Sequence, residues 1–468
     1  MTDKSTALLK LEFKRALGDI LTRVSSCAKG ASEVRDIAIA YSGGLDSSAL
    51  LHLAHAHAQE AGITLHAFHI HHGLSENADA WTQHCAANCA ALGIHFEARR
   101  IDIADLLKSG TEEAARNGRY GALGALCAQH DVPLLLTAHH EDDQAETVLL
   151  QLLRGSGVAG LSGMDRVNAA PDLLGHPTLM MGRPLLGVSR AQLDDFVAGQ
   201  GITYVDDESN TDPRFARNAL RHQVMPVIAQ LFPGYAQRFS RSAQHAQSAQ
   251  RLLIDLAAQD LADCLDGDCI VLARLRLLSS DRIDNLLRYW FGSRRMRMPS
   301  TAWLIEMRSQ LLEAKADAQL CVSHPDGHIR RHRDRVYLTP KQTIDTELVD
   351  PEPFKWAGQA AIAFPQFGGT LHVEPAAHGL PSDWLRQQSL ELRYRSGGER
   401  LKLAPNRPTK NLKHLCQALD IPAWERETLI IVATPKQALY ASGIGMDCHH
   451  TNEEAGEHLV FRWQPDAM

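Results

Sequence analysis

A short turn near residue 45 combines glycines, serines and one carboxylate. It follows an apolar run at residues 37–41 and reads Tyr41-Ser42-Gly43-Gly44-Leu45-Asp46-Ser47-Ser48. Where a parallel strand leads into a helix, the first backbone N–H groups of the helix face bound anions. Gly43 and Gly44 allow positive φ angles and a close approach of the backbone to a phosphate. Ser42 and Ser47 add hydroxyl donors, so the segment predicts a phosphate-binding turn.

Asp46 is the informative residue of this turn, because a carboxylate among phosphate-facing amides repels the anion unless a divalent cation lies between them. The turn lacks the Gly-Lys-Ser/Thr sequence of the common nucleotide-binding loop, so γ-phosphate transfer is not indicated. The alternative is an ordinary glycine turn in which Asp46 or Ser47 caps the next helix. The position after a first strand favours the phosphate-binding interpretation.

A second acidic cluster opens a later helix and includes Asp142 and Asp143. The stretch reads His139-His140-Glu141-Asp142-Asp143-Gln144-Ala145-Glu146-Thr147. Paired carboxylates at the end of a strand, beside the first turn, suit a magnesium ion that bridges phosphates. Acids that only complement a helix N-terminus are the alternative. The sequence disfavours a zinc site built from His69, His71, His72 and His139.

Between the two clusters, Arg116 and Arg119 are spaced to share one helix face. Arginine forks match the geometry of phosphate groups, so this pair is a candidate for stabilising a phosphate or a developing adenylate. A solvated helix surface of glutamates and arginines explains the spacing equally well.

The elements that position these residues alternate between apolar runs and helical patterns. We expect strands at residues 37–41, 63–70, 95–103 and 132–138, and helices at 47–59, 79–92, 112–129 and 141–154. This alternation predicts an α/β fold with a doubly wound, mainly parallel sheet. A surface loop is expected over residues 161–178, followed by a strand at 179–186 and a helix at 190–198.

Farther along the chain, strand signals disappear from about Ala229 to Leu261 and the sequence becomes helical and rich in Ala, Gln and Leu. The section from Cys269 to Leu338 is mixed, and the proline-punctuated stretch from Thr339 to Pro365 is expected to be a linker or an irregular entry. We therefore predict three domains. They are a catalytic α/β domain over 1–228, a mostly helical middle domain over 229–342 and a small α+β C-terminal domain over 343–468.

Composition excludes several classes of protein. The 468 residues are 44% apolar and 22% charged, which is typical of a globular protein, and at about 150 residues per domain the length fits three domains. The net charge of -7 excludes a uniformly basic coat but permits a local basic face. The nine cysteines contain no C-x-x-C pair, which favours reduced thiols. With no signal-peptide or membrane-spanning pattern, we expect a cytoplasmic protein.

Together these motifs resemble the tRNA(Ile)-lysidine synthetase family. Ser42-Gly43-Gly44-Leu45-Asp46-Ser47 is similar to the SGGxDS loop of the PP-loop (N-type) ATPases, which cleave ATP between its α and β phosphates. The other matching segments, in family order over about residues 35–225, are His71–Leu74, Ala115–Tyr120, His139–Thr147, Arg183–Leu186, Asp207–Asp212 and Arg217–Arg221. Segments 393–400 and 421–426 resemble the family's C-terminal domain. Many relatives carry an arginine after Leu74, whereas Ser75 stands here, which puts any role of that arginine in doubt.

The resemblance implies an enzyme that joins L-lysine to C2 of the cytidine at the first anticodon position of tRNA(Ile) with a CAU anticodon. ATP adenylates the C2 oxygen, and the lysine ε-amine then displaces AMP. ATP would be held by Ser42, Gly43, Gly44, Leu45, Asp46 and Ser47. Asp46, Arg116, Asp142 and Asp143 would be catalytic, with Asp46 and Asp143 as the ligands of Mg²⁺. The amine has a pKa of about 10.4, so its deprotonation at pH 7 costs about 4–5 kcal/mol, and the sequence does not say which carboxylate lowers that cost.

Two basic segments are candidates for contacting tRNA. Arg214, Arg217 and Arg221 share a helix face with Asn218, and they either bind tRNA or brace the end of the catalytic domain, with equal weight. Residues 391–426 hold eight lysines and arginines against four acids, a local excess that suits phosphate contacts. The predicted tRNA-binding residues are Arg217, Arg221, Arg395, Arg400 and Lys410.

Two other functions compete with the ligase. A PP-loop tRNA thiolation enzyme typically uses paired cysteines or an iron–sulfur cluster, and Cys85-x-x-x-Cys89 is not such a pair. The other is a catalytically silent tRNA-binding protein, and the intact carboxylates argue against it. The sequence leaves open whether the protein is a monomer or a homodimer.

Overall fold

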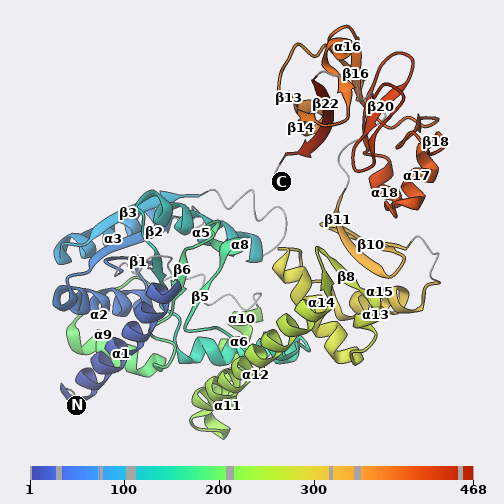
Figure 1. Ribbon diagram of the computed structural model, residues 1–468. Helices are drawn as coiled ribbons and strands as arrows, with labels where there is room; N and C mark the ends of the chain where they lie inside the picture. The colour runs from blue at the N-terminus through green and yellow to red at the C-terminus, as the bar shows by residue number, and fades with distance from the viewer. Residues whose placement is uncertain are drawn as a thin grey trace. The chain divides into compact units, whose positions relative to one another are not determined.

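The computed structural model describes residues 3–27, 34–71, 73, 77–101, 112–206, 216–315, 320–341, 349–451 and 457–466. The chain forms two compact units, Met1–Leu256 and Ala257–Met468, and each is described by itself (Figure 1). Several residues of the sequence motifs lie outside the described part of the chain. They are His72, Leu74, Ser75, 207–212 and Arg214.

A six-stranded sheet forms the centre of the first unit, in the order β3-β2-β1-β4-β6-β5. All neighbouring strands are parallel except β5 and β6, which are antiparallel. This sheet confirms the predicted α/β fold. The strands are β1 (Asp36–Ala40), β2 (Thr64–His71), β3 (His95–Arg100), β4 (Leu134–Leu136), β5 (Val167–Ala169) and β6 (Met180–Gly182).

Helices cover both faces of this sheet, as its sequence alternation requires (Figure 1). Ile37 and Ile39 of β1 point to one face, and Ala38 points to the other. The first face packs against α1 (Asp3–Cys27), α2 (Leu45–Ala61), α3 (Ala78–Leu92) and α9 (Arg190–Gln200). The second packs against α5 (Glu112–Gln129) and α8 (Pro171–Leu174). The carboxyl ends of β1, β2 and β4 therefore meet at one edge of a covered sheet.

The expected surface loop over residues 161–178 is wrong. This stretch contains β5 and α8, directly after the short helix α7 (Val158–Leu161). Val167 is buried on the sheet edge, and Leu174 is buried against α5. Pro171 begins α8 and Gly175 ends it, whereas Asn168 lies inside β5. The burial of Val167 and Leu174 thus outweighs the local preference of this segment for a loop.

Other helices of the first unit lie near the active site or continue toward the second unit in sequence. α6 (Glu141–Leu153) begins directly after β4, and α10 (Ala216–Ala219) continues into a π-helical turn (Leu220–Val224) and α11 (Met225–Leu231). Pro226 lacks the backbone N–H that an α-helix would use at this point, which accounts for the widened turn before it. The long helix α12 (Tyr235–Cys264) follows.

The second unit contains two kinds of substructure. After α12 come α13 (Leu272–Leu275), α14 (Ser280–Ser293) and α15 (Thr301–Glu313), which pack around Trp290 and Phe291. The mainly helical middle region is thus confirmed, with an additional antiparallel sheet in the order β7-β8-β11-β10-β9. Its strands are β7 (Leu265–Asp266), β8 (Cys269–Val271), β9 (Cys321–His324), β10 (Gly327–His332) and β11 (Arg335–Pro340).

The C-terminal part has an α+β fold, as expected. One sheet has the order β12-β16-β19-β20-β21 and another the order β13-β14-β22-β15, and they share a core that includes Leu371, Leu392 and Val432. The strands are β12 (Glu352–Phe354), β13 (Ala361–Phe364), β14 (Gly369–Ala376), β15 (Leu380–Pro381), β16 (Leu390–Tyr394), β19 (Ile430–Ala433), β20 (Ala438–Ala441), β21 (Gly445–Met446) and β22 (His458–Pro465). A separate ribbon pairs β17 (Arg400–Leu401) with β18 (Lys410–Asn411), and the short helices are α16 (Ser382–Arg386), α17 (Leu412–Ala418) and α18 (Ala423–Arg426).

The two boundaries between the three domains proposed from the sequence remain predictions. The structure divides instead into two compact units, and α12 runs without a break across that division. In the part of the chain that the structure describes, no helix combines the length and the apolar character that crossing a membrane requires.

Candidate active site

The glycine turn between β1 and α2 is built around Gly43. Its φ of +84° lies in the left-handed region, and a Cβ there would stand 2.7 Å from Cys85 Sγ and 3.0 Å from Val205 Cγ2. A side chain is therefore excluded both by conformation and by space. Gly44 differs from the expectation, because its φ is −72° and a Cβ would meet ordinary contacts only. Only the first glycine needs its conformational freedom.

The serines of the turn bond to each other and to the backbone. The hydroxyls of Ser42 and Ser47 lie 3.0 Å apart, and Ser47 Oγ donates to the Gly44 carbonyl at 3.0 Å. Gly44 occupies the N-cap position of α2 without a side-chain capping bond. Asp46 and Ser47 thus do not make the capping bond that the alternative interpretation assigned to them.

Asp46 faces the cavity from the first turn of α2 with one oxygen unused. Its Oδ1 is buried and has no hydrogen-bond partner among the described residues, while Oδ2 accepts from Arg190 Nη1 at 3.4 Å. Burial raises the pKa of Asp46 above its usual value, and the nearby His140 and Arg190 oppose that rise. A buried carboxylate oxygen without a donor is suited to a cation.

The start of α6 supplies the second acidic group. Asp143 Oδ2 accepts from the His140 backbone N–H at 3.1 Å, so this residue does complement the helix N-terminus. Asp142 Oδ2 accepts from the Arg190 backbone N–H at 2.8 Å, and its Oδ1 lies 3.4 Å from the Tyr235 hydroxyl. Both carboxylates also line the cavity, so Asp143 both bonds to the helix N-terminus and faces the cavity.

The His140 imidazole lies among all three carboxylates. Nε2 is 3.7 Å from Asp46 Oδ2 and 3.4 Å from Asp143 Oδ2, and Nδ1 is 3.7 Å from Asp142 Oδ2. The ring is almost fully buried, and within the described structure neither nitrogen makes a hydrogen bond. His140 thus connects the glycine turn to the acidic helix start without saturating their oxygens.

Two arginines form ion pairs with acidic residues of α6. Arg221 donates from Nε to Glu146 Oε1 at 2.6 Å and from Nη2 to Asp143 Oδ1 at 2.8 Å. Arg217 donates to Glu146 Oε2 at 3.0 Å and to Asp143 Oδ1 at 3.3 Å. The acids are three positions apart on α6, so they share one face of that helix. Arg217 on α10 and Arg221 in the following π-helical turn are four positions apart and both reach these acids. Burial raises the pKa of Asp143, but His140 and these arginines outweigh it and hold the value at about 2.

These groups surround a cavity of about 960 Å³. The predicted residues on its lining are Ser42, Gly44, Leu45, Asp46, Ser47, Arg116, Asp142, Asp143, Arg217 and Arg221. Gly43 supports the turn from behind and does not line the cavity. Arg116 and Arg119 both reach the lining, and the Arg116 guanidinium lies 5.5 Å from the centre of the Tyr120 ring. The volume is in the range of small-molecule sites.

His139 also lines this cavity. Its Nδ1 lies 2.9 Å from Thr137 Oγ1, and burial lowers its pKa to about 3, so the ring is neutral. His69 is 2.9 Å from the Tyr41 carbonyl, and His71 is 2.9 Å from Asp79. Each of these three described histidines therefore has a different partner.

Four residues of the site escaped the sequence analysis: His140, Glu146, Arg190 and Tyr235. His140 and Glu146 stood inside the quoted acidic motif, and their spacing to Asp143 is the signal that could have found them. Arg190 and Tyr235 come from distant helices, so no local pattern marks them.

The predicted C-terminal tRNA contacts belong to the second unit. Arg400 and Lys410 are exposed on the β17–β18 ribbon at neighbouring register positions. Arg395 is half-buried after β16, with a buried Nε that lacks a partner in the described structure. Arg393 from the same segment is already paired with Glu399 at 2.8 Å. Arg400 and Lys410 are thus accessible cations of this segment, as are Arg407 and Lys413.

Comparison with known proteins covers most of the chain. The PP-loop domain family matches residues 10–228, the TilS substrate binding domain matches 271–337 and the TilS substrate C-terminal domain matches 390–463. The tRNA(Ile)-lysidine synthase of Burkholderia pseudomallei is 39% identical over 92% of this chain and 94% of the relative. That of Ralstonia nicotianae is 38% identical over 95% and 96%, and that of Nitrosomonas europaea is 33% identical over 92% of each chain. Since these relatives are 33–39% identical over at least 92% of its length, the chain belongs to the tRNA(Ile)-lysidine synthase family.

Proposed function

We propose that this protein is an ATP-dependent ligase that joins L-lysine to C2 of the cytidine at the first anticodon position of tRNA(Ile) with a CAU anticodon. The products are lysidine, AMP and pyrophosphate. The observation that carries the proposal is the convergence of Asp46 with Asp142 and Asp143 around His140, on a cavity that also presents Arg116. Family membership supports the same activity.

The glycine turn is the proposed binding site for ATP. Ser42, Leu45 and Ser47 line the cavity beside the first backbone N–H groups of α2, which attract the phosphates. Asp46 and Asp143 are the proposed ligands of Mg²⁺, and the partnerless Oδ1 of Asp46 fits that role. When bound, Mg²⁺ would neutralise phosphate charge as pyrophosphate leaves.

Arg116 is the proposed electrostatic stabiliser of the adenylation step. It lies across Tyr120 on the exposed end of α5 and reaches the cavity that the glycine turn faces. Adenylation moves negative charge from the attacking C2 oxygen onto the α-phosphate and the leaving pyrophosphate. A guanidinium there stabilises that charge through paired N–H donors.

Lysine attacks C2 of the activated base as a neutral amine and displaces AMP. Its proton must leave first, and the carboxylates of the cavity supply acceptors inside a partly desolvated site. Asp143 has a pKa of about 2 and is a poor base. The raised pKa of Asp46 makes that group a stronger one, although cation binding opposes its protonation.

The thiolation alternative is not supported by the thiols of this domain. Burial raises the pKa of Cys85 and of Cys89 to about 12, so both remain protonated at neutral pH. Cys85 Sγ instead packs behind the glycine turn. The silent-protein alternative is disfavoured because Asp46 keeps a buried, partnerless oxygen, which a site without a cation would have no reason to maintain.

The partners follow from this activity. We propose tRNA contacts by Arg395, Arg400 and Lys410 in the second unit. For Arg217 and Arg221, the ion pairs to Asp143 and Glu146 support the bracing role, and tRNA contact by these two remains a prediction. The cytoplasm, which holds uncharged tRNA and ATP and keeps thiols reduced, is the proposed location.

The direct test combines the full-length protein with ATP, Mg²⁺, labelled L-lysine and unmodified CAU-anticodon tRNA(Ile). We expect label in the tRNA together with stoichiometric AMP and pyrophosphate. A tRNA with uridine at the first anticodon position is the substrate control and should accept none. Asp46→Asn should abolish pyrophosphate release while tRNA affinity stays within twofold, with the exposed Asp172→Asn as the matched control. Normal pyrophosphate release by Asp46→Asn would refute the assignment.

A further inference from the structure

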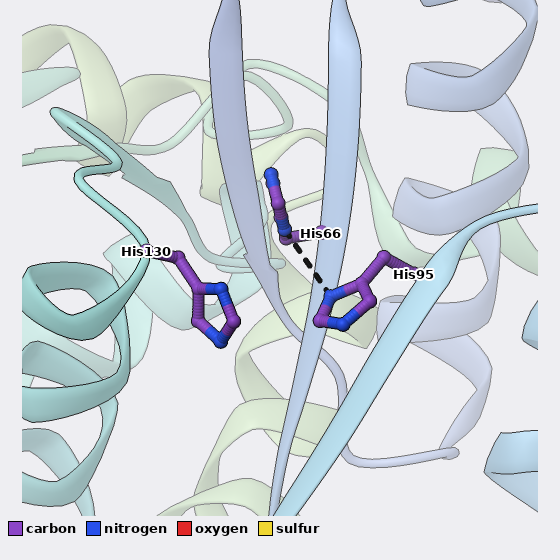
Figure 2. A group of neighbouring side chains, drawn as sticks. All are labelled: His66, His95 and His130. Carbon is purple, nitrogen blue, oxygen red and sulfur yellow. Dashed lines mark hydrogen bonds between the residues drawn. The ribbon is translucent and has the colours of Figure 1, made fainter.

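Three histidines gather at the sheet edge where the strands begin. His66 lies near the start of β2, His95 is the first residue of β3, and His130 directly follows α5 (Figure 2). The active-site cavity lies at the other edge, where His69 and His71 near the carboxyl end of β2 contribute to its lining. The cluster is therefore separate from the nucleotide site and has no part in the proposed reaction.

The spacing of the rings suits a metal ion. One nitrogen from each histidine lies within 4.8 Å of the other two, and the Nδ1 atoms of His66 and His95 are 3.3 Å apart. In a tetrahedral site with zinc–nitrogen bonds of about 2.0–2.1 Å, neighbouring ligand nitrogens are about 3.3–3.4 Å apart. The first pair already has this separation. His95 is exposed and His130 half-buried, so rotation of these side chains can bring in the third nitrogen.

Carboxylates support the outer sides of two rings. His130 Nε2 lies 2.6 Å from Glu97 Oε2, and His66 Nε2 lies 3.5 Å from Asp36 Oδ1. A carboxylate at Nε2 holds the proton there and leaves the Nδ1 lone pair free to bind a cation. This carboxylate–histidine arrangement is the usual outer shell of metal-bound histidines. Figure 2 shows the His130 ring beside the other two rings, with one of its nitrogens on the side of His66.

The three neutral rings cannot satisfy all of their facing nitrogens by hydrogen bonds to one another. With Nε2 of His66 and His130 protonated toward their carboxylates, both Nδ1 atoms are acceptors, and only His95 can offer a proton between them. One N–H cannot serve two lone pairs on different rings. A cation at the centre satisfies all three nitrogens at once.

We propose that His66, His95 and His130 bind one divalent transition-metal ion, with Zn²⁺ as the cation of choice. Imidazole nitrogens favour zinc and its first-row neighbours, whereas Mg²⁺ prefers oxygen ligands, so the two ions would occupy different sites. The bound ion links β2, β3 and the connection from α5 to β4. Its role is structural, and a water molecule completes the tetrahedron.

The test is a titration of the metal-free, full-length protein with ZnCl₂ by calorimetry, in millimolar Mg²⁺ to occupy the carboxylates of the active site. We expect one tight equivalent, a higher melting temperature with zinc, and the visible absorption of a tetrahedral complex when Co²⁺ replaces it. His95→Gln should weaken zinc binding at least a hundredfold, and Glu97→Gln should weaken it about tenfold. His245→Gln, an exposed histidine on α12, is the matched control and should bind normally.

Because His95 is exposed, its replacement leaves the core of the sheet intact, and far-ultraviolet circular dichroism without metal verifies the fold. The proposal is overturned if the wild-type protein takes up no stoichiometric zinc. It is equally overturned if folded His95→Gln retains the wild-type affinity and cobalt spectrum, because the tight site would then lie elsewhere.

Discussion

The Nε2 atom of His140 lies 3.7 Å from Oδ2 of Asp46, which joins the start of α6 to the glycine turn before α2. The same ring is within 3.7 Å of Asp142 and Asp143. Three carboxylates facing one cavity repel one another, and a buried imidazole among them reduces that repulsion while leaving oxygens free. This relationship makes His140 a positioning residue of the acidic site.

We expect His140→Gln to lower the rate of tRNA-dependent pyrophosphate release about 10- to 100-fold, the range seen for residues that support metal ligands. His140 lowers the pKa of both Asp46 and Asp143, so its loss raises both values. The acidic limb of the pH–rate profile should therefore shift to higher pH. His372→Gln in β14 is the control. A slower enzyme with an unmoved acidic limb would contradict the electrostatic role.

The local parts of the site could be predicted from the sequence, because they depend on neighbours in the chain. Asp46 after an apolar strand and Asp142 at a helix start mark the carboxyl ends of parallel strands, which meet at one sheet edge. The contact of His140 with Asp46 depends on how β1 and β4 pair, which no local pattern states. Helix α1 was not predicted, although the sequence contains a pattern that indicates it. Its buried apolar residues recur at helical spacing, and they are Leu9, Phe13, Leu17, Ile20 and Val24.

Arg221 shows the limit of interpreting charge from sequence. A basic residue in a basic segment of a tRNA enzyme is expected to face solvent and phosphates. Its actual partners, Glu146 and Asp143, lie on a helix far away in the chain, and burying those acids required a cation. Composition alone cannot distinguish an arginine that pairs with a buried acid of the same protein from one that binds a ligand.

Gly43→Ala should destabilise the glycine turn. The new Cβ would lie 2.7 Å from Cys85 Sγ at a φ of +84°, so the turn must move or the sheet face must open. We expect a loss of about 1–3 kcal/mol in unfolding free energy and a higher KM for ATP. Gly44→Ala is the matched control, because its φ is −72° and its nearest neighbour is 3.5 Å away. The two variants are compared by urea unfolding. Equal losses of unfolding free energy would contradict the requirement for glycine at position 43.

Arg221→Gln should destabilise the first unit, because Glu146 is only 4% exposed and would lose its closest donor. We expect a loss of about 1–3 kcal/mol in urea unfolding. In a double-mutant cycle with Glu146→Gln, the two substitutions should couple by about 0.5–3 kcal/mol. The exposed Arg400→Gln should change stability by less than about 0.5 kcal/mol. Additive effects of the first two substitutions would contradict the bracing contact.

Arg400→Gln and Lys410→Gln should each weaken tRNA binding and reduce the slope of log affinity against log salt by about 1. Both residues are exposed on one ribbon, so each can release a counterion from a phosphate. The exposed Lys436→Gln outside this segment is the control. In the same fluorescence titration, a reduced slope for Arg221→Gln would support tRNA contact by that residue, and an unchanged slope would support bracing. Wild-type slopes for both ribbon variants would refute the ribbon as a tRNA surface.

Glu141 should make stability fall as the pH rises toward 7. Burial, followed by the charges of Asp142 and Glu12, raises its pKa from 4.5 to about 7. Between these two pH values the folded protein keeps a proton that the unfolded chain has released. The resulting stabilisation is complete below pH 4.5 and is lost as the pH passes 7. Its upper bound is about 3 kcal/mol, from about 1.4 kcal/mol per pH unit.

Glu141→Gln tests this linkage, because the amide resembles the protonated carboxyl at every pH. The variant should match the wild type near pH 5 and exceed it by about 1–3 kcal/mol at pH 8 in urea unfolding. Glu306→Gln, an exposed glutamate on α15, should track the wild type throughout. Since Glu141 does not line the cavity, adenylation at pH 7 should continue in the variant. A stability difference that stays constant from pH 5 to pH 8 would mean that Glu141 is ionised in the folded protein across this range.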